Sequence, residues 1–97
     1  MKKIMVVAAL AALPSLASSQ DMGIALCDTF YRQYEACVSS RIPEAQRSAF
    51  RDAIEQTRSG LRQLATDPQA RPQVENLCQL HRTQMTQALA AYGCTFN

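Results

Sequence analysis

The sequence has no tryptophan, one histidine, three glycines and four prolines among its 97 residues. So little glycine and proline excludes a collagen-like or flexible repeat, and the 47% of hydrophobic residues excludes a disordered tail. A chain of this length forms at most one small domain. Multidomain enzymes and nucleotide-binding folds built from several strand–helix units are therefore excluded as well.

Long apolar runs are also missing, with one exception near the start of the chain. Ten apolar residues, 4–13, follow two lysines and end at a proline, and small residues come next. This order is typical of a secretory signal peptide, and ten residues fall short of the roughly 20 that span a bilayer. We predict a signal peptide over residues 1–19, cleaved after Ala17 or Ser19. A single helical domain over residues 20–97, without a transmembrane segment, is expected to follow.

Lysine occurs only within the predicted signal peptide, so cleavage changes the charge balance. The remaining chain has eight arginines and eight acidic residues, which gives a net charge of zero when the histidine is neutral. The charge of +2 on the full chain thus comes from the export signal. A global electrostatic argument for nucleic acid or membrane lipid as a partner is lost with it.

The cysteines Cys27, Cys37, Cys78 and Cys94 all lie after the predicted cleavage site. Nine, forty and fifteen residues separate them, so there is no C-x-x-C pair of the kind that zinc sites and catalytic thiols use. An even number of cysteines in a short exported chain indicates structural disulfides. Closing a loop of about 50 residues stabilises a small domain by roughly 4 kcal/mol in the chain-entropy model. We therefore predict two disulfides and a periplasmic or secreted location.

Apolar residues recur every three or four positions in three segments, and no segment alternates with a period of two. The first predicted helix covers residues 24–41, with Asp21 as its candidate N-cap. The second covers residues 43–66, and the third covers residues 70–92 with Gly93 as its C-cap. The expected fold class is all-α, a small three-helix antiparallel bundle.

The heights of the cysteines along the bundle decide how they pair. Short loops make consecutive helices antiparallel, so the first and third helices run parallel. At about 1.5 Å per residue, Cys27 and Cys78 lie within about 2 Å of the same height, and Cys37 and Cys94 both lie near the first turn. A bond between Cys27 and Cys94 would have to bridge more than about 20 Å, where a disulfide allows about 6 Å between Cα atoms. We predict Cys27–Cys78 and Cys37–Cys94, which leaves the second helix held by packing alone.

His81 follows Cys78 by three residues and precedes Met85 by four, so the three side chains project from one side of a helix. Such a set could hold copper, but a disulfide removes the thiolate, and packing within the bundle is the simpler interpretation. A metal or small-ligand carrier that uses His81 and Met85 stays as the alternative hypothesis. No serine has a nucleophile-elbow context, and the carboxylates are scattered among arginines. We expect no enzyme, no cofactor and no bound metal.

Arg47, Arg51, Arg58 and Arg62 recur at intervals of four, seven and four residues, along a line about 22 Å long on the second predicted helix. Arginine suits bidentate contacts with carboxylates, so this row is the candidate surface for a protein partner. Glu55 lies in the same row, and a solvated, partly self-paired face is the alternative. Nucleic acid is the weakest partner, because export removes access to it and no aromatic residues are interleaved.

Three motifs carry a resemblance to known proteins. They are the helix from Cys27 to Cys37 with Tyr31 and Tyr34, the turn Leu77-Cys78-Gln79, and the closing Gly93-Cys94-Thr95-Phe96. With them the chain resembles small exported four-cysteine helical proteins of Gram-negative bacteria, which are grouped in families of unknown function. It resembles more distantly periplasmic immunity proteins and periplasmic acid-stress chaperones, although the chaperones carry two cysteines. No functional residue follows from these resemblances. We predict an exported protein that binds another protein as an inhibitor, immunity protein or chaperone.

Overall fold

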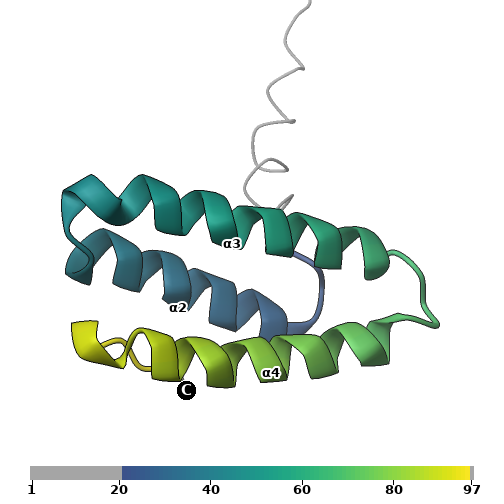
Figure 1. The fold of residues 1–97 in the computed structure, drawn as a ribbon. Coiled ribbons are helices and arrows are strands. Elements are labelled where there is room, and N and C mark those ends of the chain that lie inside the picture. Colours follow the sequence, from purple (N-terminus) through teal and green to yellow (C-terminus); the bar gives the residue numbers. More distant parts are fainter. Residues whose placement is uncertain (1–20, 97) are drawn as a thin grey trace, which may run out of the picture.

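The computed structural model describes residues 21–96, which form three long helices and a short 3-10 turn (Figure 1). Helix α2 spans Ala25–Arg41, α3 spans Glu44–Leu64, α4 spans Arg71–Ala88, and the turn η2 spans Ala90–Tyr92. Residues 21–96 contain no strand, and consecutive helices run in opposite directions, which confirms the all-α three-helix antiparallel bundle. The predicted signal peptide, residues 1–19, lies outside the described residues. Within residues 21–96, no helix has both the length and the apolar character needed to cross a membrane.

The core lies where α2 faces the other two helices. Phe30, Tyr31 and Val38 of α2 and Val74 of α4 are each at most 2% exposed. The ring of Phe30 lies 4.9 Å from that of Tyr31 and 5.3 Å, edge to face, from that of Phe96. Helices α3 and α4 each pack more extensively against α2 than against one another. Helix α2 is therefore the central element of the bundle.

Two disulfides tie α2 to the chain of α4 and the segment after it, with the pairing that the sequence predicts. Cys27 and Cys78 are fully buried, and their Cα atoms lie 5.3 Å apart. The Cα atoms of Cys37 and Cys94 lie 5.9 Å apart. Helix α3 contains no cysteine, so neither disulfide reaches it.

The start of α2 differs from the sequence prediction. Asp21 is not its N-cap, because Ile24 occupies that position and no side chain caps it. Instead the carboxylate of Asp28, in the first turn of α2, accepts the backbone N–H groups of Met22 at 2.8 Å and of Gly23 at 3.1 Å. Gly23 has a φ of +78°, which turns the preceding chain back over the helix end. The carboxylate of Asp28 thus holds the chain that precedes α2, and no side chain caps the helix itself.

Helix α4 also ends earlier than predicted. Its last residue is Ala88, and η2 carries the chain on to Gly93. Gly93 has a φ of +82°, which glycine adopts without strain, and it caps η2 rather than α4. A Cβ at this position would lie 2.9 Å from Nη1 of Arg41 at the end of α2. The absence of a side chain at Gly93 therefore leaves room for the guanidinium of Arg41 beside the residue that precedes Cys94.

Replacing each disulfide by a pair of alanines tests how much stability the two covalent ties supply. We expect Cys27→Ala with Cys78→Ala to lower the free energy of unfolding by about 4 kcal/mol, because the bond closes a loop of 51 residues. Cys37→Ala with Cys94→Ala, with a separation of 57, is expected to have a similar effect. Urea denaturation of the oxidised proteins measures both losses. A loss below about 1 kcal/mol for either pair would contradict a large contribution from that disulfide.

Candidate functional site

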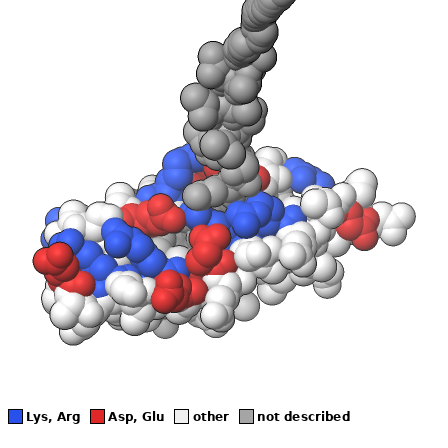
Figure 2. All heavy atoms as spheres, turned by 90° about the horizontal axis from the view of Figure 1, so that it is seen from above, with Lys and Arg blue, Asp and Glu red and all other residues white. Residues whose placement is uncertain are grey.

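The four arginines predicted as a partner surface lie along the side of α3 that faces α2. Arg47 donates from Nε to the backbone oxygen of Ile42 at 2.9 Å, and Arg51 donates to Oγ of Ser39 at 2.9 Å. Both acceptors belong to α2 or to the residue that ends it. Figure 2 looks onto the molecule from the side of α3 and shows arginines and acidic side chains interspersed. The first half of the row therefore fastens α3 to its neighbour within the same chain.

Arg58, one of the four arginines predicted to form the partner surface, is buried, with 4% of its surface exposed, so it adds little exposed surface to that row. Its Nη1 lies 3.1 Å from a carboxylate oxygen of Glu35 on α2 and 3.5 Å from one of Glu55. Its guanidinium carbon lies 5.1 Å from the centre of the Tyr31 ring, a cation–π contact. Arg62, at the end of the row, also pairs with Glu55, at 3.8 Å. The charge of Arg58 is satisfied inside the bundle.

All charged residues of α3 share one side of the helix. They are Glu44, Arg47, Arg51, Asp52, Glu55, Arg58 and Arg62. At 3.6 residues per turn they fall within an arc of about 140°. The opposite side of α3 carries alanine, glycine, glutamine, threonine and leucine and has no charge. The sequence-based prediction considered only the arginines of this helix and therefore missed its uncharged side. The spacing of all the charged residues in the sequence already indicates that side.

Helix α3 and helix α4 border a shallow groove on the uncharged side. It has a volume of about 170 Å³ and is lined by Thr57 and Leu61 of α3 and by Leu77, Leu80, His81 and Gln84 of α4. Leu77 is 42% exposed and Leu80 is 53% exposed, and Leu64, one turn beyond Leu61, is 50% exposed. Large apolar side chains that cluster on a surface mark an interaction site more often than single ones do. The groove is thus the centre of an apolar patch.

The side of α4 next to the groove is free of charge as well. Arg71, Glu75 and Arg82 fall within an arc of about 40° on another side of the helix. We use the name neutral face for the exposed, uncharged residues of the two helices around the groove. They are Gln46, Ala49, Ala53, Gln56, Thr57, Gly60 and Leu64 of α3, and Gln73, Asn76, Leu77, Leu80, Thr83, Gln84 and Gln87 of α4. This face has apolar side chains at its centre and neutral polar ones around them.

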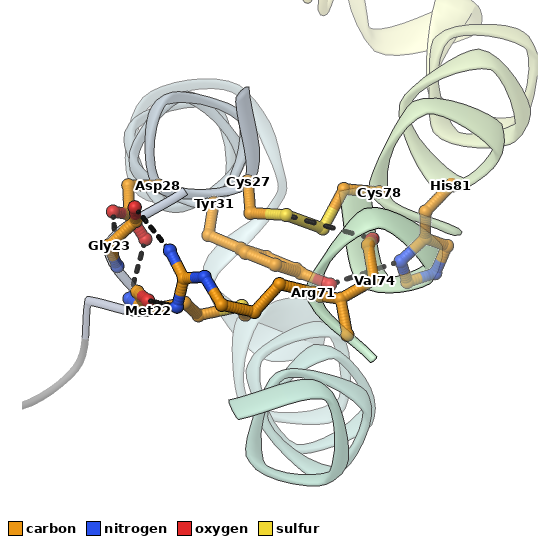
Figure 3. Close-up of a disulfide and its surroundings, with 9 residues drawn as sticks. All are labelled: Met22, Gly23, Cys27, Asp28, Tyr31, Arg71, Val74, Cys78 and His81. Atoms are coloured by element: carbon orange, nitrogen blue, oxygen red, sulfur yellow. Dashed lines mark hydrogen bonds between the residues drawn. A yellow bond between two sulfur atoms is a disulfide. The ribbon is translucent and has the colours of Figure 1, made fainter. Parts of the chain in front are cut away.

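His81 connects the groove to the core. Its Nδ1 lies 3.4 Å from the hydroxyl oxygen of Tyr31, which reaches from α2 between the other helices (Figure 3). Its ring also lies 5.7 Å from that of Phe30. Burial lowers the pKa of His81 below its usual value of 6.5, so the imidazole is neutral at neutral pH. Burial raises the pKa of Tyr31 to about 12, against the opposing effect of the positive charge on Arg58.

The residues that a metal or small-ligand carrier would use, His81 and Met85 with Cys78 beside them, have contacts within the protein. Cys78 is bonded to Cys27, and Met85 packs against the core. His81 has the hydroxyl of Tyr31 at its Nδ1. Among residues 21–96, no group of three or more His, Cys, Asp or Glu side chains is placed to hold a metal ion. The carrier hypothesis therefore gains no ligand set from the geometry.

A wider, open hollow of about 440 Å³ lies where the chain enters α2. It is lined by Gly23, Ile24, Ala25, Pro68, Arg71, Pro72 and Glu75. The guanidinium of Arg71 donates to the backbone oxygens of Gly23 at 2.8 Å and Met22 at 3.2 Å (Figure 3). It also donates to the backbone oxygen of Ala65 at 3.1 Å. This arginine fastens the start of α2 to the start of α4, which is a structural role.

Comparison with known proteins adds no relative. No protein-family model matches the chain, and no curated protein and no solved structure is significantly similar to it. The neutral face and the disulfide-bonded bundle that supports it are therefore the features on which a function can be based.

Arg58→Ala tests whether the buried arginine holds α3 in place. We expect the free energy of unfolding to fall by about 1–3 kcal/mol, because the change removes the packing over Tyr31 and the hydrogen bond to Glu35. The control is Arg32→Ala, whose side chain is 63% exposed and pairs with Asp21 at 3.4 Å. It should change stability by less than about 0.5 kcal/mol. Equal losses in urea denaturation would rule out a special role for Arg58.

The lowered pKa of His81 predicts that acid weakens the fold. The unfolded chain binds a proton near pH 6.5, whereas the folded protein resists it, so the unfolded state holds more protons between the two pKa values. The free energy of unfolding should therefore decrease as the pH falls from above 6.5 towards the lowered pKa. Urea denaturation at about pH 7.5 and about pH 5.5 measures the decrease. His81→Phe keeps an aromatic ring and should show a smaller decrease; an identical one would assign the pH dependence to other groups.

Proposed function

We propose that this chain is an exported protein, periplasmic or secreted, that binds another protein chain through its neutral face and does not act by catalysis. The observation that carries the proposal is the exposure, at 42–53%, of Leu77 and Leu80, which line one uncharged groove, and of Leu64, one turn beyond the groove residue Leu61. Depletion of charge at the centre of a patch is the composition that distinguishes protein interfaces from other surface.

The size of the groove favours a side chain over a free ligand as its occupant. Sites for drug-sized molecules have volumes of about 300–1,000 Å³, and this groove has about 170 Å³. Such a volume suits one large apolar side chain of a partner. Interfaces are commonly anchored by a few side chains that fill pockets of this kind.

The leucines supply a driving force of the right order. Full burial of a leucine side chain contributes about 1.5–3 kcal/mol, so completing the burial of three that are half exposed contributes about 3 kcal/mol. The partner's own apolar surface adds a comparable amount. This free energy of burial is sufficient for an interaction of moderate affinity without any contact from the arginines. The arginines of α3 instead make contacts within the chain.

Export is supported by the cysteines and by the sequence that precedes the described residues. All four cysteines are paired, and disulfides persist in oxidising compartments such as the periplasm and the cell exterior. A small helical bundle with two disulfides keeps a rigid surface there without a large core. A small bundle that is cross-linked by two disulfides and exposes the neutral face is suited to binding another chain.

Site-specific photo-crosslinking in cells tests the proposal. A photoreactive amino acid replaces Leu80, at the centre of the neutral face, in the full chain. The control places it at Arg32 of α2, an exposed residue outside the neutral face. We expect a discrete adduct from position 80 and none from position 32, in the fraction that contains exported proteins.

Two results would contradict this function. One is the absence of any adduct at positions 80, 77 and 64 when the protein is expressed and oxidised. The other is recovery of the full-length product, with free thiols, from the cytoplasm alone. If an adduct forms, toxin neutralisation would identify an immunity role, and suppression of client aggregation would identify a chaperone role.

A further inference from the structure

We propose that the chain that covers the neutral face is a second copy of this protein, so that α3 and α4 of two copies form a four-helix interface. The proposal rests on the proposed function, because it names the partner of the same face. Both partners then contribute an antiparallel helix pair, and helices in such bundles are packed by their apolar sides. Four observations on this face support a copy as its occupant.

The first observation is the absence of charge. In a dimer with two-fold symmetry each face meets itself, so a charged residue near the axis would face its own copy at short range. The charged residues of α3 fall within an arc of about 140° and those of α4 within an arc of about 40°, on sides of the helices other than those that carry the groove residues. Self-association therefore meets no like-charge repulsion here. A different protein would find no charge on this face to steer its approach.

The second observation is that the neutral face has both exposed leucine side chains and a groove. The groove of about 170 Å³ can receive a large apolar side chain. Leu80 at its edge is 53% exposed, and Leu64 nearby is 50% exposed. Each copy thus has leucines to donate and a groove to accept one. An interface formed by the same patch on both chains requires this self-complementarity.

The third observation is the low relief of α3 beside the groove. Ala49, Ala53 and Gly60 are exposed on this side of the helix. A Cβ added at Gly60 would have no heavy atom within 4 Å, so the surface there is open. Small residues leave shallow grooves between the ridges of a helix, into which the side chains of a second helix can pack.

The fourth observation is the area that the face can bury. Helix α4 has 18 residues and is therefore about 27 Å long, and two adjacent helices of about 10 Å diameter are about 20 Å wide. The face then measures about 500 Å² on each copy, or about 1,000 Å² for the pair. This is close to the smallest area found in specific interfaces. A dimer that dissociates in the micromolar range is therefore expected.

Sedimentation equilibrium of the oxidised protein, without its signal peptide, tests the proposal. We expect reversible dimerisation across about three decades of concentration centred on the micromolar range. Leu80→Gln and Leu64→Gln should each weaken the dimer by about tenfold or more, whereas Arg32→Gln should leave it unchanged. Raising the salt concentration should not weaken it, because the interface has no charge to screen. Circular dichroism confirms that the leucine variants, which alter exposed positions, keep the helical fold.

The results separate this proposal from the proposed function. A monomer at all concentrations, with an adduct to another protein from position 80, overturns the second copy and leaves protein binding through the face intact. A monomer with no adduct overturns both. A dimer that is insensitive to Leu80→Gln and Leu64→Gln, or one that salt dissociates, overturns the neutral face as its interface. An adduct of twice the chain mass from position 80 of the pure protein supports it.

Discussion

The packing of the buried Arg58 against Tyr31 is the contact on which the arrangement of the three helices depends. Tyr31 comes from α2, Arg58 of α3 lies 5.1 Å from its ring, and His81 of α4 lies 3.4 Å from its hydroxyl. One turn earlier on α2, Cys27 forms the buried disulfide to α4. The phenol thus joins the covalently tied pair of helices to the third helix. A cation within this site requires compensation, which the carboxylates of Glu35 and Glu55 supply at 3.1 Å and 3.5 Å.

This contact matters because the covalent ties are distributed unevenly. Two disulfides fix the register of α2 against α4 and its extension, and α3 has none. Helix α3 is held by apolar packing, by the arginine contacts to α2 and by the hydrogen bond from the Tyr34 hydroxyl to the Phe50 backbone oxygen at 3.2 Å. Such contacts break without any change of covalent structure, so α3 is the helix that we expect to move most readily.

The sequence was sufficient for the covalent framework and insufficient for the orientation of α3. Rise per residue fixes the height of each cysteine within a few ångströms, and a disulfide tolerates little mismatch, so the pairing of Cys27 with Cys78 could be predicted. Spacing places Arg47 to Arg62 on one side of α3, but it does not say whether that side faces solvent or α2. The absence of an N-cap at Asp21 could not be predicted for a similar reason, because the contact of Asp28 with the chain before α2 depends on the turn at Gly23.

The two sides of α3 follow from the same distribution of charge. A helix on the surface of a bundle usually turns its apolar side inwards and its charged residues towards water. In α3, Arg51 and Arg58 contact α2 and Arg47 contacts the residue that ends it, and this concentration of charge on one side leaves alanine, glycine, glutamine and leucine on the other. A polar contact region therefore lies within the chain, between α2 and α3, while the apolar patch between α3 and α4 stays open to solvent. Burial of that patch against a second chain would give α3 apolar packing on the one side where its own chain provides little.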